Sequence, residues 1–296
     1  MKTPNFFIIG APKCGTTSLA AWLSEHPQVF FSSEKEPHHF NTDQAWVLTP
    51  KRKDYEKYFT DAGSQHRAVG EGSVWYLYSK LAVPQIEQYC PEARYIVCLR
   101  NPVEMAYSLH EQQVVTGNEH IKDFAQAWKL SNARLNGEKI SRWCTEPSHL
   151  AYGTACKLGE QLQRMHAIVP RDRVLPVLLD DVKENPRRVY LDILRFLALE
   201  DDGKSEFKVE NTAKELRSAS LRKFVLVMGW IKRMLGIRSG LGILQAIDRN
   251  NLTFRARKKM DPQLKRDLEN HFSQDIVLLE TLLNRDLSAW TSTGLN

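Results

Sequence analysis

Short apolar runs alternate with longer stretches of helical periodicity along most of this chain. Continuous apolar runs predict buried strands at residues 6–9, 29–31, 95–99 and 174–179. Apolar residues at helical spacing predict helices at residues 16–26, 103–116, 123–136, 152–169, 186–197 and 264–283. Strands that alternate with helices indicate an α/β fold: a central parallel sheet flanked by helices, with right-handed crossovers and a largely helical C-terminal part.

Length and composition indicate one folded domain. The chain has 296 residues, of which 42% are hydrophobic and 26% are charged, values typical of a globular protein. We find no internal repeat and no linker, so we expect a single domain over residues 1–296. No apolar run approaches the ~20 residues of a membrane-spanning helix, so we expect no transmembrane segment. Residues 220–247 are both apolar and basic; we interpret them as a helical hairpin on the core, with a helix that contacts the membrane surface or the acceptor as the alternative.

An excess of positive charge favours an anionic partner. The formal net charge is +6, which suits a nucleotide, an acidic glycan, a nucleic acid or a membrane surface. We expect no nucleic acid, because the chain has no helix–turn–helix, RNP or zinc-finger pattern. The cysteines are Cys14, Cys90, Cys98, Cys144 and Cys156, and they form neither a CxxC pair nor a metal-ligand spacing. An odd number of such thiols indicates a reducing, cytoplasmic compartment and no metal site.

A glycine-containing loop joins the first expected strand to the first expected helix. Its sequence, GAPKCGTT from Gly10 to Thr17, nearly matches the phosphate-binding pattern GxxxxGK[ST], except that the lysine lies inside the loop. Backbone N–H groups and the helix dipole favour an anion at such a helix N-terminus. Lys13 adds a positive charge, and Thr16 adds a hydroxyl donor. The pattern therefore predicts a phosphate site at a P-loop-like turn.

Residues at the ends of two later strands distinguish between kinds of nucleotide chemistry. The run YIVCL ends at Arg100, a cation in a place where metal-dependent NTPases use a carboxylate. This favours a ligand with a second phosphate and no metal. Asp180 and Asp181 follow residues 174–179 and could hold Mg²⁺, so a P-loop kinase or NTPase is the alternative, although helix capping is their simpler role. A non-enzymatic anion-binding protein is a third, weaker alternative, because the cations lie in separate motifs.

These motifs resemble those of the sulfotransferases that use 3′-phosphoadenosine-5′-phosphosulfate (PAPS). GAPKCGTTSL is similar to the family's 5′-phosphosulfate loop, and YIVCLRNPVEMAYSLH to its 3′-phosphate segment. KEPHHF at residues 35–40 resembles the E-x-H-F-F element of the glycan-type (heparan sulfate) branch, and residues 70–77 resemble the element after it. The likeness continues through residues 152–199 and 255–262. Gly72 stands at a position where the glycan-type enzymes often have a lysine. The family's Golgi members have a membrane anchor, and because we expect none here, a prokaryotic-type enzyme is favoured.

The resemblance implies transfer of a sulfonate group from PAPS to a hydroxyl acceptor on a glycan, lipid or small metabolite. Adenosine 3′,5′-bisphosphate would be the product, and no metal would be needed. Lys13 would stabilise the leaving phosphate. Glu36 would be the general base, since its loop follows a strand at the ligand-binding edge of the sheet; His38 would orient the proton or act as the rival base. The donor would be held by Lys13, Cys14, Gly15, Thr16, Thr17, Ser18, Arg100, Ser108, Arg257 and Lys258.

Two further expectations concern side chains near the nucleotide. A helix N-terminus and Lys13 would lower the pKa of the Cys14 thiol. Trp22, Trp75 and Tyr76 could stack on adenine, although an aromatic side chain at such spacing is more often part of the core.

Overall fold

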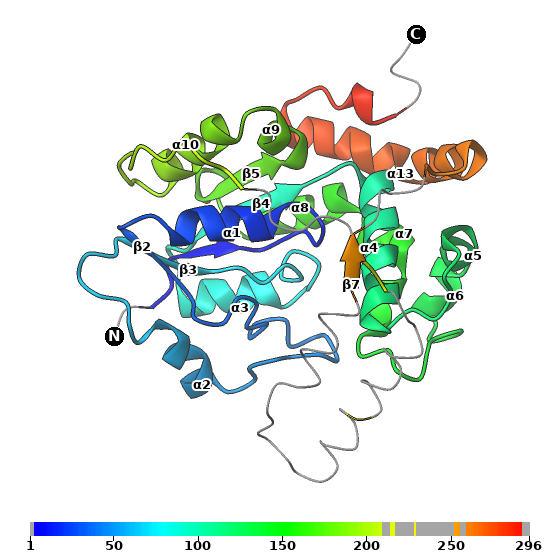
Figure 1. Ribbon diagram of the computed structural model, residues 1–296, viewed down its shortest axis with the longest axis horizontal. Helices are drawn as coiled ribbons and strands as arrows, with labels where there is room; N and C mark the ends of the chain where they lie inside the picture. Colours follow the sequence, from blue (N-terminus) through cyan, green and yellow to red (C-terminus); the bar gives the residue numbers. More distant parts are fainter. Residues whose placement is uncertain (1–2, 209–213, 217–227, 229–251, 255–258, 292–296) are drawn as a thin grey trace.

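The computed structural model describes residues 3–208, 214–216, 228, 252–254 and 259–291 (Figure 1). Its centre is a five-stranded sheet in the order β2-β3-β1-β4-β5, and every neighbouring pair is parallel. The strands are β1 (Phe6–Ile8), β2 (Val29–Phe31), β3 (Ala68–Glu71), β4 (Arg94–Leu99) and β5 (Val174–Leu178). The predicted α/β class with a central parallel sheet is confirmed.

Helices surround this sheet. They are α1 (Thr16–Ser24), α2 (Arg52–Glu56), α3 (Ala82–Tyr89), α4 (Pro102–Thr116), α5 (Phe124–Lys129), α6 (Ser131–Leu135), α7 (Tyr152–Ala155), α8 (Leu158–His166), α9 (Leu179–Glu184), α10 (Pro186–Phe196) and α13 (Pro262–Leu283). Short 3-10 helices lie at Lys57–Phe59, Pro147–Leu150, Arg171–Arg173 and Ser288–Trp290. Two more strands, β6 (Lys214–Leu216) and β7 (Leu252–Phe254), form an antiparallel pair. Figure 1 shows α4 to α7 beyond the carboxyl ends of the strands and α9, α10 and α13 on the β5 side.

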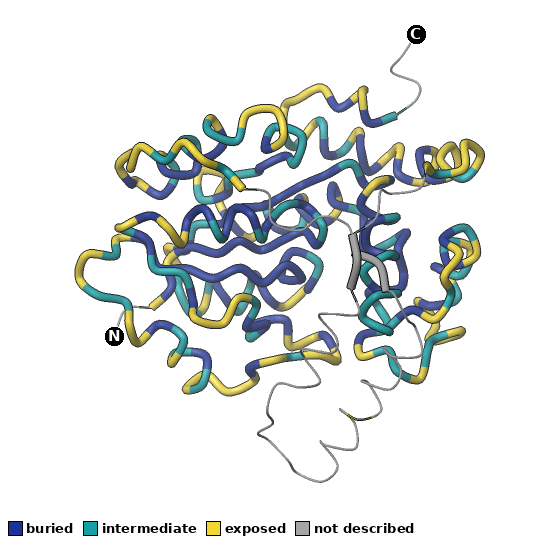
Figure 2. Tube along the Cα trace, in the orientation of Figure 1, coloured by how far each residue is buried: buried dark blue, intermediate teal, exposed yellow. Residues whose placement is uncertain are grey.

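The middle of the sheet is buried on both faces. Phe6, Phe7 and Ile8 of β1 have no exposed surface, and β4 is buried from Tyr95 to Leu99 (Figure 2). Helices on both sides of a parallel sheet account for the continuous apolar runs, because neither strand face meets water. The core therefore fixes the strand ends from which the site loops emerge.

The sequence did not predict every element. It gave no strand at β3, which is short and contains Gly70; the Phe6 ring lies 2.4 Å from where a Cβ at Gly70 would be. Helices α2 and α3 were also not predicted. The expected helix at residues 123–136 is two helices, α5 and α6.

The expected helix at residues 152–169 is also divided, into α7 and α8. The Asp275 carboxylate of α13 accepts hydrogen bonds from the backbone N–H groups of Gly159 (2.9 Å) and Glu160 (2.8 Å). A side chain more than a hundred residues away therefore caps a new helix start, and local periodicity carries no sign of it.

Two predictions fall on parts of the chain that are not described. The loop with Arg257 and Lys258 lies outside the described residues, and so does nearly all of residues 220–247. Among the helices that are described, none has the length and apolar character needed to cross a membrane.

Candidate active site

The phosphate loop connects β1 to α1 as predicted. Gly15, directly before the first residue of α1, has φ 87°, and a Cβ there would lie 2.9 Å from the Leu179 side chain. Only glycine meets both conditions without strain. The Ala11 N–H donates to the Cys98 carbonyl (2.6 Å) and so fastens the loop to β4. The first turn of α1 is thereby held at the carboxyl edge of the sheet, the arrangement that binds phosphate in other proteins.

Cys14 lies in this loop with its side chain in the core. The residue is 1% exposed, and its Sγ lies 4.0 Å from the Met105 sulfur. Burial raises the pKa of the thiol to about 12, and the opposing effects of Arg100 and Lys13 are smaller. The expectation of a lowered pKa is therefore wrong, because desolvation outweighs the nearby positive charges. Cys14 shapes the loop and is not a reactive thiol.

Arg100 lies beside the phosphate loop at the end of β4. Its Nη1 donates to the Lys13 carbonyl (3.2 Å), and its Nη2 forms an ion pair with Glu104 of α4 (2.7 Å). The structure thus places Arg100 against the phosphate loop, as the sequence implied. The ion pair between Arg100 and Glu104 was not predicted. Ser108 follows on the same helix and is 1% exposed. A shared contact of Arg100 and Ser108 with a 3′-phosphate stays a prediction.

The loop after β2 holds Glu36 between two basic side chains. One carboxylate oxygen lies 3.0 Å from Lys35 Nζ, and the other lies 3.3 Å from His38 Nε2. Burial alone would raise the pKa of Glu36, but the His38 hydrogen bond and the Lys35 charge outweigh it and lower that pKa. Glu36 is therefore ionised at neutral pH, the state in which a carboxylate accepts a proton. His38 is almost fully buried behind it.

Lys35 was given no role by the sequence analysis. Its Nζ donates both to Glu36 and to Thr17 Oγ1 in the first turn of α1 (2.8 Å). One ammonium group therefore connects the phosphate loop with the candidate base. A lysine next to the predicted base was the available signal, but sequence alone does not show that it bends back to α1.

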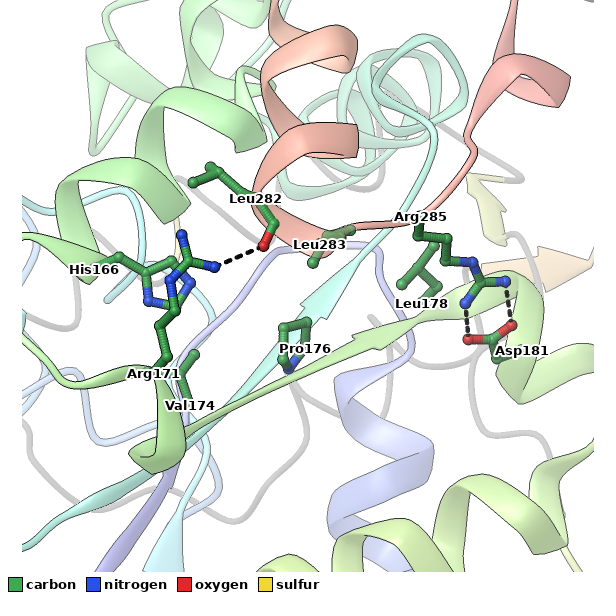
Figure 3. Close-up of a pocket in the computed structure, with 9 residues that line it drawn as sticks. All are labelled: His166, Arg171, Val174, Pro176, Leu178, Asp181, Leu282, Leu283 and Arg285. Carbon is green, nitrogen blue, oxygen red and sulfur yellow. Dashed lines mark hydrogen bonds and ion pairs between the residues drawn. The ribbon is translucent and has the colours of Figure 1, made fainter.

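The carboxylates proposed for an alternative Mg²⁺ site are held by cationic and donor side chains. Both terminal nitrogens of Arg285 donate to Asp181, at 2.5 and 2.6 Å (Figure 3). This hydrogen-bonded pair lowers the pKa of Asp181. Asp180 pairs with Lys183 (3.0 Å) and accepts a hydrogen bond from the Trp290 indole (3.0 Å). Both aspartates lie within the first turn of α9, whose N-cap residue is Leu178, so the expected capping role before residue 182 is not confirmed; their charges favour the helix dipole instead.

A cavity of about 310 Å³ lies next to Asp181, between β5 and the end of α13 (Figure 3). It is lined by His166, Arg171, Val174, Pro176, Leu178, Asp181, Leu282, Leu283 and Arg285. No phosphate-loop residue lines it, so it is separate from the candidate site. In the described part of the chain, no three His, Cys, Asp or Glu side chains are grouped so that they could hold a metal ion.

The aromatic residues considered for adenine stacking are buried in the core. Trp22 donates to the Lys208 carbonyl (2.9 Å) and packs against Phe207. Trp75 stacks on His149 with ring centroids 3.3 Å apart, and Tyr76 has no exposed surface. These three side chains therefore belong to the core in this structure.

Comparisons with known proteins agree on one family. The family model described as "Sulfotransferase domain" matches residues 3–274. Membrane-associated sulfotransferase kil1 of Dictyostelium discoideum is 35% identical over 105 residues, covering 36% of this chain and 22% of the relative. Carbohydrate sulfotransferase 15 of Mus musculus is 32% identical over 147 residues, covering 36% and 26%. The matches thus span about a quarter of these relatives. A sulfotransferase structure from Alicyclobacillus acidocaldarius superimposes with a TM-score of 0.73 at 25% identity, covering 98% of this chain and 99% of that one.

Proposed function

Since the chain belongs to the sulfotransferase family, we propose that it transfers a sulfonate group from PAPS to a hydroxyl acceptor and releases adenosine 3′,5′-bisphosphate. One observation carries the proposal: the Lys35 ammonium joins the phosphate loop, at Thr17, to the carboxylate of Glu36. An anion site and a general base therefore lie at one edge of the sheet, where parallel α/β sheets bind ligands.

The residues present suit a donor with two anionic ends. Lys13, Thr16, Thr17 and Ser18 belong to the loop and the first turn of α1, and would hold the 5′-phosphosulfate. Arg100 is tied to the Lys13 carbonyl and would bind the 3′-phosphate with Ser108. Charge-assisted hydrogen bonds of this kind are the strong ones in phosphate recognition.

The proposed reaction needs one proton acceptor and positive charge on the leaving group. The acceptor oxygen attacks sulfur, its proton passes to Glu36, and the bond from sulfur to the bridging phosphate oxygen breaks. The bond's electrons remain on the 5′-phosphate, where Lys13 stabilises the developing charge. In the free protein His38 and Lys35 together lower the pKa of Glu36. An anionic donor at Thr17 would compete for this ammonium, and Glu36 would become a stronger base once the donor is bound.

A carbohydrate hydroxyl is the acceptor we propose to test first, because one relative is a carbohydrate sulfotransferase by name.

The kinase or NTPase alternative is disfavoured by the partners that already hold Asp180 and Asp181. A reducing, cytoplasmic compartment stays a prediction; the five cysteines, all in the described part of the chain, are free thiols. A helical hairpin at residues 220–247 also stays a prediction, with peripheral membrane contact as its alternative.

Calorimetry tests the donor assignment. Adenosine 3′,5′-bisphosphate should bind much more tightly than 5′-AMP and ATP, and EDTA should leave its affinity unchanged. ATP binding that requires Mg²⁺, with no preference for the 3′-phosphate, would instead support the kinase alternative.

A further inference from the structure

Three consecutive backbone N–H groups of the base-bearing loop are bound by two buried hydroxyls. The His38 N–H donates to Ser73 Oγ (3.0 Å). The N–H groups of His39 (2.8 Å) and Phe40 (3.3 Å) both donate to the Tyr76 hydroxyl. His38 has φ 46°, a conformation that L-residues rarely adopt. These contacts therefore hold a backbone turn two residues after Glu36 that the local sequence does not favour.

Both hydroxyls meet at one carboxyl group, that of Glu71. The Ser73 hydroxyl donates to Glu71 Oε2 (2.7 Å), and the Tyr76 hydroxyl interacts with the same carboxyl. A third hydroxyl, that of Tyr55, donates to Oε1 (3.3 Å). All four side chains have no exposed surface. Glu71 is the last residue of β3 and lies in register with Phe7 of β1, so the central sheet fixes its place.

This arrangement decides which way the hydroxyls point. A hydroxyl has a single proton to donate, and its lone pairs accept. When the Ser73 proton is directed to Glu71, the lone pairs of that oxygen face the His38 N–H. An apolar residue in place of Glu71 would fill the space without orienting any hydroxyl.

We propose that Glu71 is a positioning residue for sulfonate transfer: through Ser73 and Tyr76 it holds the loop that carries Glu36 and His38 in its reactive place. The inference rests on the proposed function, in which Glu36 accepts the acceptor's proton. Burial raises the pKa of Glu71 to about 7, and the hydroxyls that donate to it oppose this rise because they favour the ionised, accepting form.

The test uses Ser73→Ala and Tyr76→Phe, with Tyr95→Phe as the matched control. Tyr95 is a buried tyrosine of the same sheet whose hydroxyl donates to another glutamate, Glu87 (2.7 Å). Hydrogen exchange should quicken at residues 36–40 in both test variants and remain unchanged there in the control. In sulfonate transfer, kcat should fall about tenfold or more, the effect of losing one or two hydrogen bonds to a positioned group. Affinity for adenosine 3′,5′-bisphosphate should stay within a few-fold.

Two further results separate positioning from a general loss of stability. In a Glu36→Gln background, Tyr76→Phe should lower the residual rate much less than it does alone, since residues acting as a unit are non-additive. Glu71→Gln, which still accepts and donates, should keep more activity than Glu71→Leu. Unchanged exchange at residues 36–40 would overturn the inference, whether or not the protein transfers sulfonate. Normal transfer by the wild type with no loss of kcat in Tyr76→Phe would overturn it while leaving the proposed function intact.

Discussion

Replacing Glu36 by glutamine tests the role of the base-bearing loop. The substitution keeps the size of the side chain and one of the two oxygens that accept from Lys35 and His38, but it removes the ability to take a proton at neutral pH. A positioned general base contributes about 10²–10⁴-fold to rate, which corresponds to roughly 3–5 kcal/mol of transition-state stabilisation. We expect kcat to fall by that factor. Nucleotide affinity should change only a few-fold, because the phosphate loop is a separate segment.

The pH dependence of the transfer rate is a second, independent test of Glu36 as the base. In the free protein His38 and Lys35 lower the pKa of Glu36 below its ordinary value of 4.5, so the wild-type acid limb of kcat/KM for PAPS, which reports the free enzyme, should lie below that pH. Single-turnover transfer from radiolabelled PAPS measures both the rate and the profile. Glu34→Gln is the matched control, since Glu34 is exposed in the same loop. The reasoning fails if Glu36→Gln transfers at the wild-type rate, or if the acid limb lies above pH 6 and His38→Ala is inactive.

Three more predictions concern the donor site, the thiol and the buried carboxyl. Arg100→Ala should erase most of the preference for adenosine 3′,5′-bisphosphate over 5′-AMP in calorimetry, about tenfold or more for one charge-assisted contact; an unchanged preference would remove Arg100 from the site. Cys14 should resist alkylation in the folded protein at pH 8, as followed by mass spectrometry, because burial raises the pKa of its thiol to about 12. Rapid labelling would contradict that burial. The Cys14→Ser variant should keep most activity. The folded pKa of Glu71, about 7, lies above the ordinary 4.5, so its stabilising contribution is complete below pH 4.5 and is lost as the pH rises through 7, by at most roughly 3 kcal/mol. In denaturant titrations Glu71→Gln should lose this part of the pH dependence, and an unchanged pH dependence would mean that Glu71 does not titrate there.

The sequence predicted those features that depend on local pattern. Apolar runs identified four of the five strands of the parallel sheet, and GAPKCGTT identified the phosphate loop between β1 and α1. The strand β3 was missed because Gly70, which the Phe6 ring requires, interrupts an already short apolar run. The break before α8 was missed because Asp275, which caps it, is distant in sequence.

Within the site, sequence placed Lys13, Glu36 and Arg100 on loops at one edge of the sheet. It did not show how these loops are joined. The bridge from Lys35 to Thr17 joins residues 18 positions apart. Ser73 and Tyr76 bind the backbone at residues 38–40 from 35 to 37 positions away, and local pattern does not show such contacts. The same cause explains the wrong expectation for Cys14: a positive loop is visible in the sequence, but the packing that excludes water from the thiol is not.

The central claim is that this chain moves a sulfonate group from PAPS to a hydroxyl without a metal. The most direct measurement is incubation of the wild-type protein with ³⁵S-labelled PAPS and a panel of carbohydrate acceptors in EDTA, with both products quantified. We predict that labelled acceptor and adenosine 3′,5′-bisphosphate form in equal amounts, and that Lys13→Ala abolishes both. Label that stays on the nucleotide with every acceptor, while the protein phosphorylates them from ATP and Mg²⁺, would contradict the account.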